Sequence, residues 1–481
     1  MNIKLIARYT GIALLFNALF MFISALVSMI YGFDSSFSPL VISTFITASV
    51  GVFPFIFVKK SEDINIKEGF IIIILSWLLV CLFGMMPYIL WGENFTLMNA
   101  WFESVSGYTT TGSTILTEVE AVPKGLLFWR SSTHFIGGIG VVIFMLLVLP
   151  AVSTFRLRIS KMEISALSKE NYKFKTKETV KIISIVYLGI TVLSTIFLMI
   201  SGMNFYDAIN HAFSIVATGG FSTKNQSLMS FHSFPIEFTA MFFMLCAGTH
   251  FGLLYQLIVH GSTKIFKSPI IKLYLGTVFF SSILVAIDIY SGGIAANWGQ
   301  ALRLAFFQVI SLNTTSGFAT ANTSIWPQFS IMLLMLLSIF TACSGSTTGG
   351  IKADRTWILF NSVKIQLRKQ LHPKGIIPLK IGHTLVPNDT LFSVLLFIGI
   401  YFLIMFICAL LLSATGIPFI ESISASVAHI GNVGPGFGRC GSLGNYLYFN
   451  DFAKFILTIE MLLGRLELFT LLMLFVIFKK N

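Results

Sequence analysis

The chain has 481 residues, of which 55% are apolar and only 11% charged, and its mean hydropathy is +0.85. Soluble domains carry about a quarter charged residues, so this composition excludes a soluble protein and indicates an integral membrane protein. The formal net charge of +12 falls mostly in segments between apolar stretches. That distribution is typical of cytoplasmic loops under the positive-inside rule, and it argues against a nucleic-acid-binding surface.

The cysteines predict neither a disulfide framework nor a metal site, because no CxxC pair or His/Cys cluster occurs. The five are Cys81, Cys246, Cys343, Cys408 and Cys440. The basic N-terminus and the apolar run that follows it resemble a signal peptide. Because that run is near membrane length and lacks a small-residue cleavage site, a retained first span is favoured.

In chain order, two spans come first, at about 9–31 and 38–58, joined by a short loop around Asp34. A basic loop follows, with Lys59, Lys60 and Lys67. A three-part unit then repeats four times: a spanning helix, a half-helix that ends at a polar glycine loop, and a second span. For each unit the ranges below give the first span, the half-helix, the polar loop and the second span, in that order. They are 70–91, 96–108, 109–114 and 125–150; 179–201, 204–216, 217–223 and 235–260; 270–291, 297–312, 313–319 and 329–362; 390–414, 418–430, 431–437 and 452–478. The predicted domains are 1–60, 61–160, 161–265, 266–370 and 371–481.

The half-helices are too short to cross about 30 Å of hydrocarbon, so they are interpreted as re-entrant segments. Ten full spans place both chain ends on one side. The charged loops 151–178 and 361–390 share that side with Lys479 and Lys480, which identifies it as the cytoplasm. The polar loops then face outward.

Four polar loops recur at near-regular spacing, at 108–114, 216–223, 313–320 and 431–438. Their aligned glycines are Gly112, Gly220, Gly317 and Gly434. Ordinary extracellular turns are also rich in Gly, Ser and Thr. Four such loops, each after a half-helix and before a long span, instead favour one pore lined from four sides.

These residue types suit a cation. Backbone carbonyls can replace the water shell of a dehydrated ion, glycine permits the dihedrals that aim them at one axis, and the C-terminal end of each half-helix carries partial negative charge. The predicted ligands are Thr110, Thr111, Gly112, Thr218, Gly219, Gly220, Thr315, Ser316, Gly317, Asn432, Val433 and Gly434. Acids near the mouth are candidate attractors: Glu103, Glu118, Glu120, Asp207 and Glu421. For Glu103, Asp207 and Glu421, placement at the start of a half-helix or a buried polar contact is the favoured interpretation.

The second span of each unit also contains a break signal. Those at 137–140 and 247–250 are equally explained by small-residue packing between helices, whereas 343–350 predicts an unwound loop that lines the pore below the filter. Arg465 is taken as the one cation inside a span, which is usually functional; a salt bridge to Glu460 or Glu467 is the alternative. A guanidinium has five donors, so Arg465 is predicted to hold the 344–350 loop across a closed pore.

The chain resembles the potassium-translocating TrkH/TrkG-type subunits of bacterial Trk uptake systems, in the Trk/Ktr/HKT superfamily. The segments that carry the resemblance are 109–114, 217–223, 314–318, 432–436, 344–350 and the pair Gly464 and Arg465. The resemblance implies an all-α integral membrane protein with two N-terminal spans and four membrane-helix/pore-half-helix/membrane-helix repeats in pseudo-fourfold array. It also implies homodimers and K⁺ uptake across the inner membrane, with K⁺ as the transported ion and no organic cofactor.

The same resemblance implies a cytosolic nucleotide-binding partner of the TrkA type. It assigns the gate to Gly345, Ser346, Thr347, Thr348, Gly349, Gly350 and Arg465. Four aligned glycines match the K⁺-preferring pattern of the superfamily. Basic residues of the cytoplasmic loops suit either this partner or anionic lipid: Arg156, Arg158, Lys161, Arg368 and Lys369.

Two other function classes remain as alternatives. A K⁺ symporter coupled to H⁺ or Na⁺ would use intramembrane carboxylates, for which Asp288, Glu460 and Glu467 are available. A membrane enzyme is disfavoured because the histidines show no metal-binding spacing; they are His134, His211, His250 and His429.

Overall fold

The computed structural model describes residues 2–58, 66–148, 176–373, 375, 377–382 and 384–478. Helices dominate this part of the chain, and one short antiparallel hairpin joins β1 (Lys380–Ile381) to β2 (Thr384–Leu385). The predicted basic loop residues Lys59 and Lys60, the terminal Lys479 and Lys480, and Arg156, Arg158 and Lys161 lie outside the described residues.

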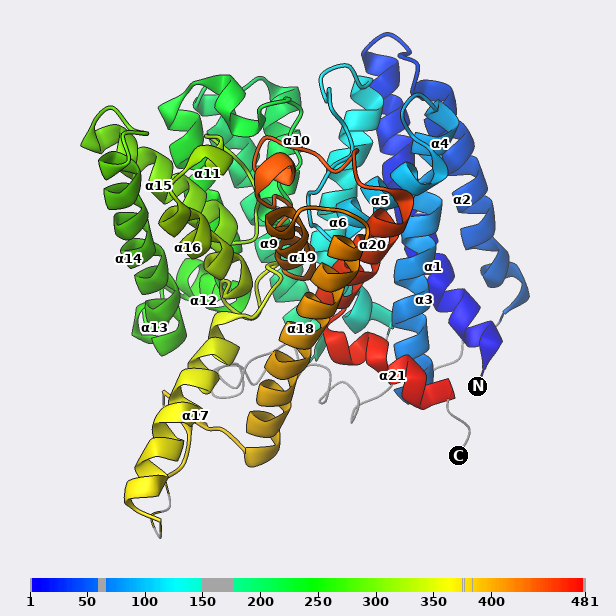
Figure 1. Cartoon of the computed structure of the whole chain (residues 1–481). Helices are drawn as coiled ribbons and strands as arrows, with labels where there is room; N and C mark the ends of the chain where they lie inside the picture. Colours follow the sequence, from blue (N-terminus) through cyan, green and yellow to red (C-terminus); the bar gives the residue numbers. More distant parts are fainter. Residues whose placement is uncertain are drawn as a thin grey trace.

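Within the described residues, six helices are long and apolar enough to cross a membrane, and a seventh span is possible if one bent pair of helices crosses together. All six coincide with predicted spans; four of them are α1 (Ile3–Ile30), α2 (Phe37–Phe57), α14 (Pro269–Ser291) and α18 (Asn388–Ala414), with α1 beginning earlier than expected. The other two are α9 (Thr176–Ile200) and the segment Lys67–Trp91, in which α3 (Ile66–Gly84) continues into α4 (Met86–Trp91). α1 and α2 pack side by side (Figure 1).

Three of the second helices are broken, two of them at the expected break signals 247–250 and 343–350. α11 (Phe234–Ala247) and α12 (Phe251–His260) meet at a bend of 105°. A non-helical loop separates α16 (Gln328–Ile339) from α17 (Ala353–Leu371). α20 (Asp451–Arg465) stops two residues before Glu467, whose φ of 59° marks the turn ahead of α21 (Leu468–Phe478).

The break signal at 137–140 does not interrupt its helix, since α6 runs unbroken over Lys124–Val148. A Cβ on Gly137 would collide with the backbone of Tyr108, and one on Gly138 with Ala217. The glycines therefore let the backbones of two neighbouring elements approach α6 closely. Small-residue packing is the correct interpretation there.

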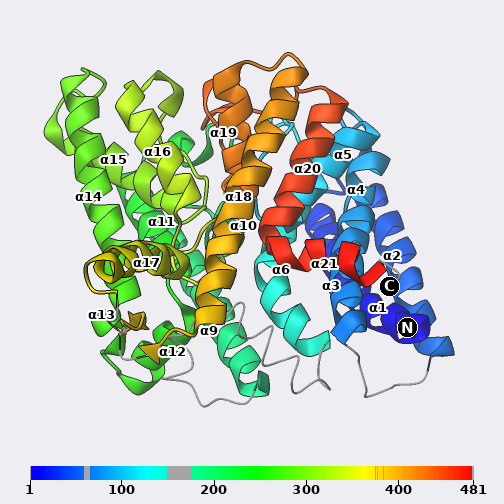
Figure 2. The same cartoon turned by 60° about the horizontal axis from the view of Figure 1, so that its bottom comes forward.

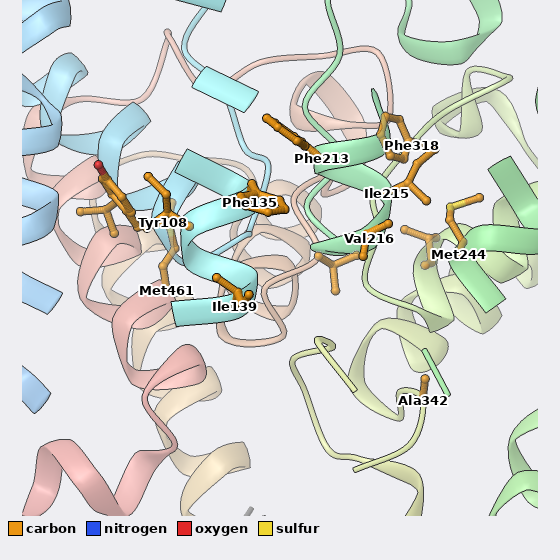
Figure 3. Packing of buried hydrophobic residues seen from close by; sticks show 14 of the residues in the cluster. Tyr108, Phe135, Ile139, Phe213, Ile215, Val216, Met244, Phe318, Ala342 and Met461 are labelled. Atoms are coloured by element: carbon orange, nitrogen blue, oxygen red, sulfur yellow. The ribbon is translucent and has the colours of Figure 1, made fainter. Parts of the chain in front are cut away.

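Four short helices occupy the predicted half-helix positions: α5 (Leu97–Tyr108), α10 (Phe205–Val216), α15 (Trp298–Asn313) and α19 (Phe419–Ile430). Three begin at a side-chain N-cap, because Thr96, Asn204 and Asn297 each accept a hydrogen bond from an amide three residues on. The short helices pack against the longer ones through buried aromatic side chains. For example, the rings of Phe135 on α6 and Phe213 on α10 have centroids 4.5 Å apart (Figure 3).

The remaining elements are one-turn helices: α13 (Lys264–Lys267), η1 (Ser227–Phe231), η2 (Thr323–Ile325) and η3 (Gly438–Cys440). α17 projects away from the helical bundle at the end where α1 begins (Figure 1). α21 lies across α3 at that same end, which Figure 2 brings forward.

Candidate functional site

The four short helices end in the same way, directly before the four polar loops. In each, the amide of the residue before the aligned glycine donates to the carbonyl five positions back, at 2.8 to 3.0 Å. The donors are Thr111, Gly219, Ser316 and Val433, and the acceptors are Ser106, Ser214, Ser311 and Ala428. This cap closes the helix and turns the chain sharply into the loop.

Each loop also alternates left-handed and ordinary backbone. The residues two before the glycines have φ between 51° and 56°, and the glycines between 69° and 100°. The first group is Thr110, Thr218, Thr315 and Asn432. A β-branched residue at positive φ is an outlier, and such strain gathers at functional sites.

The loops form a closed ring. A Cβ on Gly112 would collide with the carbonyl oxygen of Gly219, and one on Gly220 with that of Ser316. Likewise, a Cβ on Gly317 would collide with the carbonyl oxygen of Val433, and one on Gly434 with that of Thr111. Each loop therefore touches the next in chain order, and the fourth touches the first. Only glycine permits this approach of one backbone to another.

Eight buried carbonyl groups in this ring have no partner. They belong to Thr110, Thr111, Thr218, Gly219, Thr315, Ser316, Asn432 and Val433, and none accepts a hydrogen bond from the residues that the structure describes. More than nine in ten buried carbonyls in proteins are paired. A cluster of unpaired ones needs water or a cation to satisfy it.

A cavity of about 70 Å³ opens on one side of the ring, and all four aligned glycines line it. The predicted attractors are mostly engaged in structural contacts around it. Glu103 is fully buried and accepts from Thr114 and Ile115 of the first loop. Asp207 accepts from Thr223 of the second loop at 2.6 Å, and Glu421 accepts from the Tyr448 hydroxyl at 2.8 Å. These three acids brace loops, as the structural alternative expects.

The other two acids, Glu118 and Glu120, are exposed, and Glu120 lies 3.8 Å from Lys224. The statement that Arg465 is the one cation inside a span is wrong. Arg130 of α6 is 3% exposed and pairs with Glu103 at 2.6 Å. The rule that singled out Arg465 would also have found Arg130, since its position falls inside a predicted span.

Arg130 and His134 of α6 hold the second loop. The Phe221 ring lies 3.4 Å from the guanidinium of Arg130 and stacks on His134 at 3.9 Å. Arg130 also donates to the carbonyl oxygen of Ser222 at 3.3 Å. His211, His250 and His429 are likewise buried or packed in separate places, and the described residues contain no group of His, Cys, Asp and Glu that could hold a metal ion.

The 343–350 loop lies against the opposite side of the ring. The Thr347 hydroxyl donates to the carbonyl of Val216, and the Gly349 amide to the Thr315 hydroxyl, at 2.9 and 3.2 Å. A Cβ on Gly349 would collide with the carbonyl of Gly431. The predicted unwound loop therefore touches the second, third and fourth polar loops.

Arg465 reaches this loop from the end of α20. Its guanidinium donates to the carbonyl oxygen of Thr347 at 2.6 Å and to that of Gly137 at 3.0 Å. A cavity of about 40 Å³ lies between the loop and Arg465, enough for water. Of the two carboxylates expected near Arg465, Glu467 pairs with Lys352 and Arg355, and Glu460 accepts from Ser426.

Comparison with known proteins covers nearly the entire chain. A family model described as "TrkH: Cation transport protein" matches residues 39–284 and 292–481. The Trk system potassium uptake protein TrkH of Escherichia coli (strain K12) is 31% identical over 479 residues, with 99% of each chain covered. TrkG of the same organism is 31% identical over 420 residues, covering 87% of this chain and 86% of its own.

A solved structure agrees with these relatives. The crystal structure of the potassium transporter TrkH from Vibrio parahaemolyticus matches with a TM-score of 0.90 and 28% identity, and the match covers 100% of both chains. The relatives are membrane transport proteins and not enzymes. The chain belongs to the TrkH family of cation transport proteins.

Proposed function

We propose that this protein takes up K⁺ through the ring of four polar loops. The observation that supports this most is the set of eight buried, unpaired carbonyls contributed equally by four loops. Carbonyl oxygens replace the water shell of K⁺. The C-terminal ends of α5, α10, α15 and α19 meet at the same ring, and their partial negative charge favours a cation over an anion. The relatives named as potassium uptake proteins support K⁺ as that cation.

The architecture that we infer is four membrane-helix/pore-half-helix/membrane-helix repeats around one pseudo-fourfold axis, preceded by a two-span extension. Its support is the cyclic contact of the loops and their shared helix cap. The predicted ligands are the twelve residues at the three positions ending at each aligned glycine. Their hydroxyl groups differ: Thr111 and Ser316 have side-chain oxygens at the position where Gly219 and Val433 have none.

The gate that we propose consists of Gly345–Gly350 and Arg465. The loop lies directly against the ring, and Arg465 holds it through the carbonyl of Thr347. The loop blocks the path sterically, and the guanidinium repels an approaching cation. Opening requires this hydrogen bond to break and the loop to leave the ring.

The protein is further proposed to lie in the inner membrane as a homodimer, with both termini cytoplasmic and the aligned glycines facing outward. α17 then projects into the cytoplasm, where its exposed Arg368 and Lys369 are available to a TrkA-type nucleotide-binding partner. The start of α1 lies at that same end (Figure 1).

Uptake of ⁸⁶Rb⁺ into proteoliposomes that contain only this chain tests the function. A K⁺ gradient alone should drive uptake, and external K⁺ should compete far better than Na⁺. The reversal potential should follow the K⁺ gradient and ignore imposed pH and Na⁺ gradients. Uptake that required one of those gradients would instead support the symporter.

A further inference from the structure

The fourth loop differs from the other three at the glycine level. The carbonyl oxygen of Gly434 accepts a hydrogen bond from the Ser113 hydroxyl and another from the Tyr446 hydroxyl, both at 3.0 Å. In the described part of the chain, the carbonyl oxygens of Gly112, Gly220 and Gly317 accept none. The asymmetry therefore lies in the surroundings of one carbonyl, although all four residues are glycine.

A carbonyl oxygen has two lone pairs. Two hydroxyl donors occupy both at Gly434, so this oxygen has no lone pair left for a metal ion. The three unengaged carbonyls keep both of theirs. If an ion binds at this level, the fourth loop is the weakest contributor of ligands.

Tyr446 is fixed in place to do this. It is 2% exposed, and its ring packs against Phe102 and His429, with centroids 5.8 and 4.8 Å away. Its amide donates to the carbonyl oxygen of Thr114 at 2.8 Å. Tyr446 thus joins the first loop through its backbone and the fourth through its hydroxyl, and it lines the cavity above the aligned glycines.

We propose that Tyr446 and Ser113 withdraw the Gly434 carbonyl from the ion path, which leaves a three-carbonyl cation site at the glycine level. This inference rests on the proposed K⁺ pathway. Fewer carbonyl ligands hold K⁺ less tightly at this site, and conduction needs sites that an ion can leave. Tyr446 and Ser113 are positioning residues, because they act on the ion only through Gly434.

Tyr446→Phe tests this with almost no change in shape. We expect the released carbonyl to lower the K⁺ concentration for half-maximal uptake roughly threefold, about the effect of one net hydrogen bond. Competition by Na⁺ should weaken in parallel, because K⁺ prefers the larger number of carbonyls. Tyr448→Phe is the matched control, since the Tyr448 hydroxyl donates to Glu421 and not to a loop carbonyl. Ser113→Ala removes the other donor and should also lower the K⁺ concentration for half-maximal uptake.

The proposal is overturned if Tyr446→Phe and Ser113→Ala both keep the wild-type K⁺ concentration for half-maximal uptake and the wild-type strength of Na⁺ competition. An increase in the K⁺ concentration needed also overturns it, because the hydroxyls would then be holding the carbonyl toward the ion. If wild type itself shows no K⁺-selective uptake, the proposed function fails instead. Ser113→Ala keeps the test open should Tyr446→Phe fold poorly.

Discussion

The guanidinium of Arg465 donates to the carbonyl oxygen of Thr347 at 2.6 Å, although 118 positions separate the two residues in the chain. A second bond, 3.0 Å long, reaches Gly137 of α6. Two residues after Arg465, Glu467 pairs with Lys352 and Arg355, which follow the loop. The break between α20 and α21 is thereby tied to the middle of the loop that separates α16 from α17 and to the start of α17.

Replacing Arg465 by Ala should open the proposed gate. Loss of a hydrogen bond from a charged donor is worth about 1.5–3 kcal/mol, so ⁸⁶Rb⁺ uptake by the chain alone should rise roughly tenfold or more. The K⁺/Na⁺ preference should stay unchanged, because it resides in the polar loops. Lys272→Ala, at an exposed position on α14, is the control. Uptake equal to wild type in folded Arg465→Ala would remove Arg465 from the gate.

Gly112→Ser should reduce discrimination between K⁺ and Na⁺. The added Cβ would collide with the carbonyl oxygen of Gly219, and the φ of 82° disfavours any side chain. The ring must distort at one ligand. Gly276→Ser is the control, because nothing lies within 4 Å of its Cβ position. Permeability ratios measured in proteoliposomes decide the point: Gly276→Ser should keep the wild-type ratio, and a ratio unchanged by Gly112→Ser would contradict this role.

Much of this arrangement can be read from the sequence because it is local. The half-helix bounds follow from a short run that ends at a polar glycine loop, and a side-chain N-cap marks the start of three of the four. The ion-pair partners of the acids cannot be read from the sequence, because Glu103 pairs with Arg130 only once α5 and α6 have packed together. The break after Arg465 was also missed, since Leu466 and Glu467 have no breaker chemistry; the ion pairs of Glu467 with Lys352 and Arg355 hold that turn.

The charges of α17 distinguish a protein partner from lipid. Arg368 and Lys369 are exposed near its end. Double charge reversal to Glu should abolish copurification with a TrkA-type nucleotide-binding subunit, because like charges then meet at the interface. Arg439→Glu, an exposed cation on the proposed outer side, should have no effect. Intact copurification together with lost binding to anionic vesicles would assign these charges to lipid.

Asp34 should make stability depend on acid pH. Burial alone would raise the pKa of this carboxyl, but hydrogen bonds from Ser28, Ser36 and Gly125 outweigh burial and hold the pKa below its usual value. A lowered folded pKa stabilises the protein above the unfolded value of about 3.9, and this stability is lost as the pH falls through the folded pKa.

Asp34→Asn should therefore lower the thermal unfolding midpoint at pH 7. The difference between the midpoints of this variant and wild type should shrink as the pH falls to 3. Glu93→Gln, in an exposed loop, serves as the control. Parallel pH curves for wild type and Asp34→Asn would show that Asp34 contributes nothing through its charge.

The Glu103–Arg130 pair should be the most costly of the ion pairs to break on one side. Both side chains are almost fully buried, at 0% and 4% exposure. Glu103→Gln leaves the Arg130 charge without its counterion, which costs about 3–5 kcal/mol in buried pairs. It also weakens the acceptor for Thr114 and Ile115 of the first loop. The unfolding midpoint and K⁺ uptake should both fall.

The double variant Glu103→Gln, Arg130→Met should recover part of the lost stability, because it removes the stranded charge. Glu237→Gln is the matched control: its partner Arg303 is 35% exposed, so water screens the remaining charge and the loss should be smaller. Thermal unfolding midpoints measured in detergent for the three variants show which of them loses the most stability. A double variant no more stable than Glu103→Gln would show that the hydrogen bonds to the first loop, and not the buried charge, make Glu103 necessary.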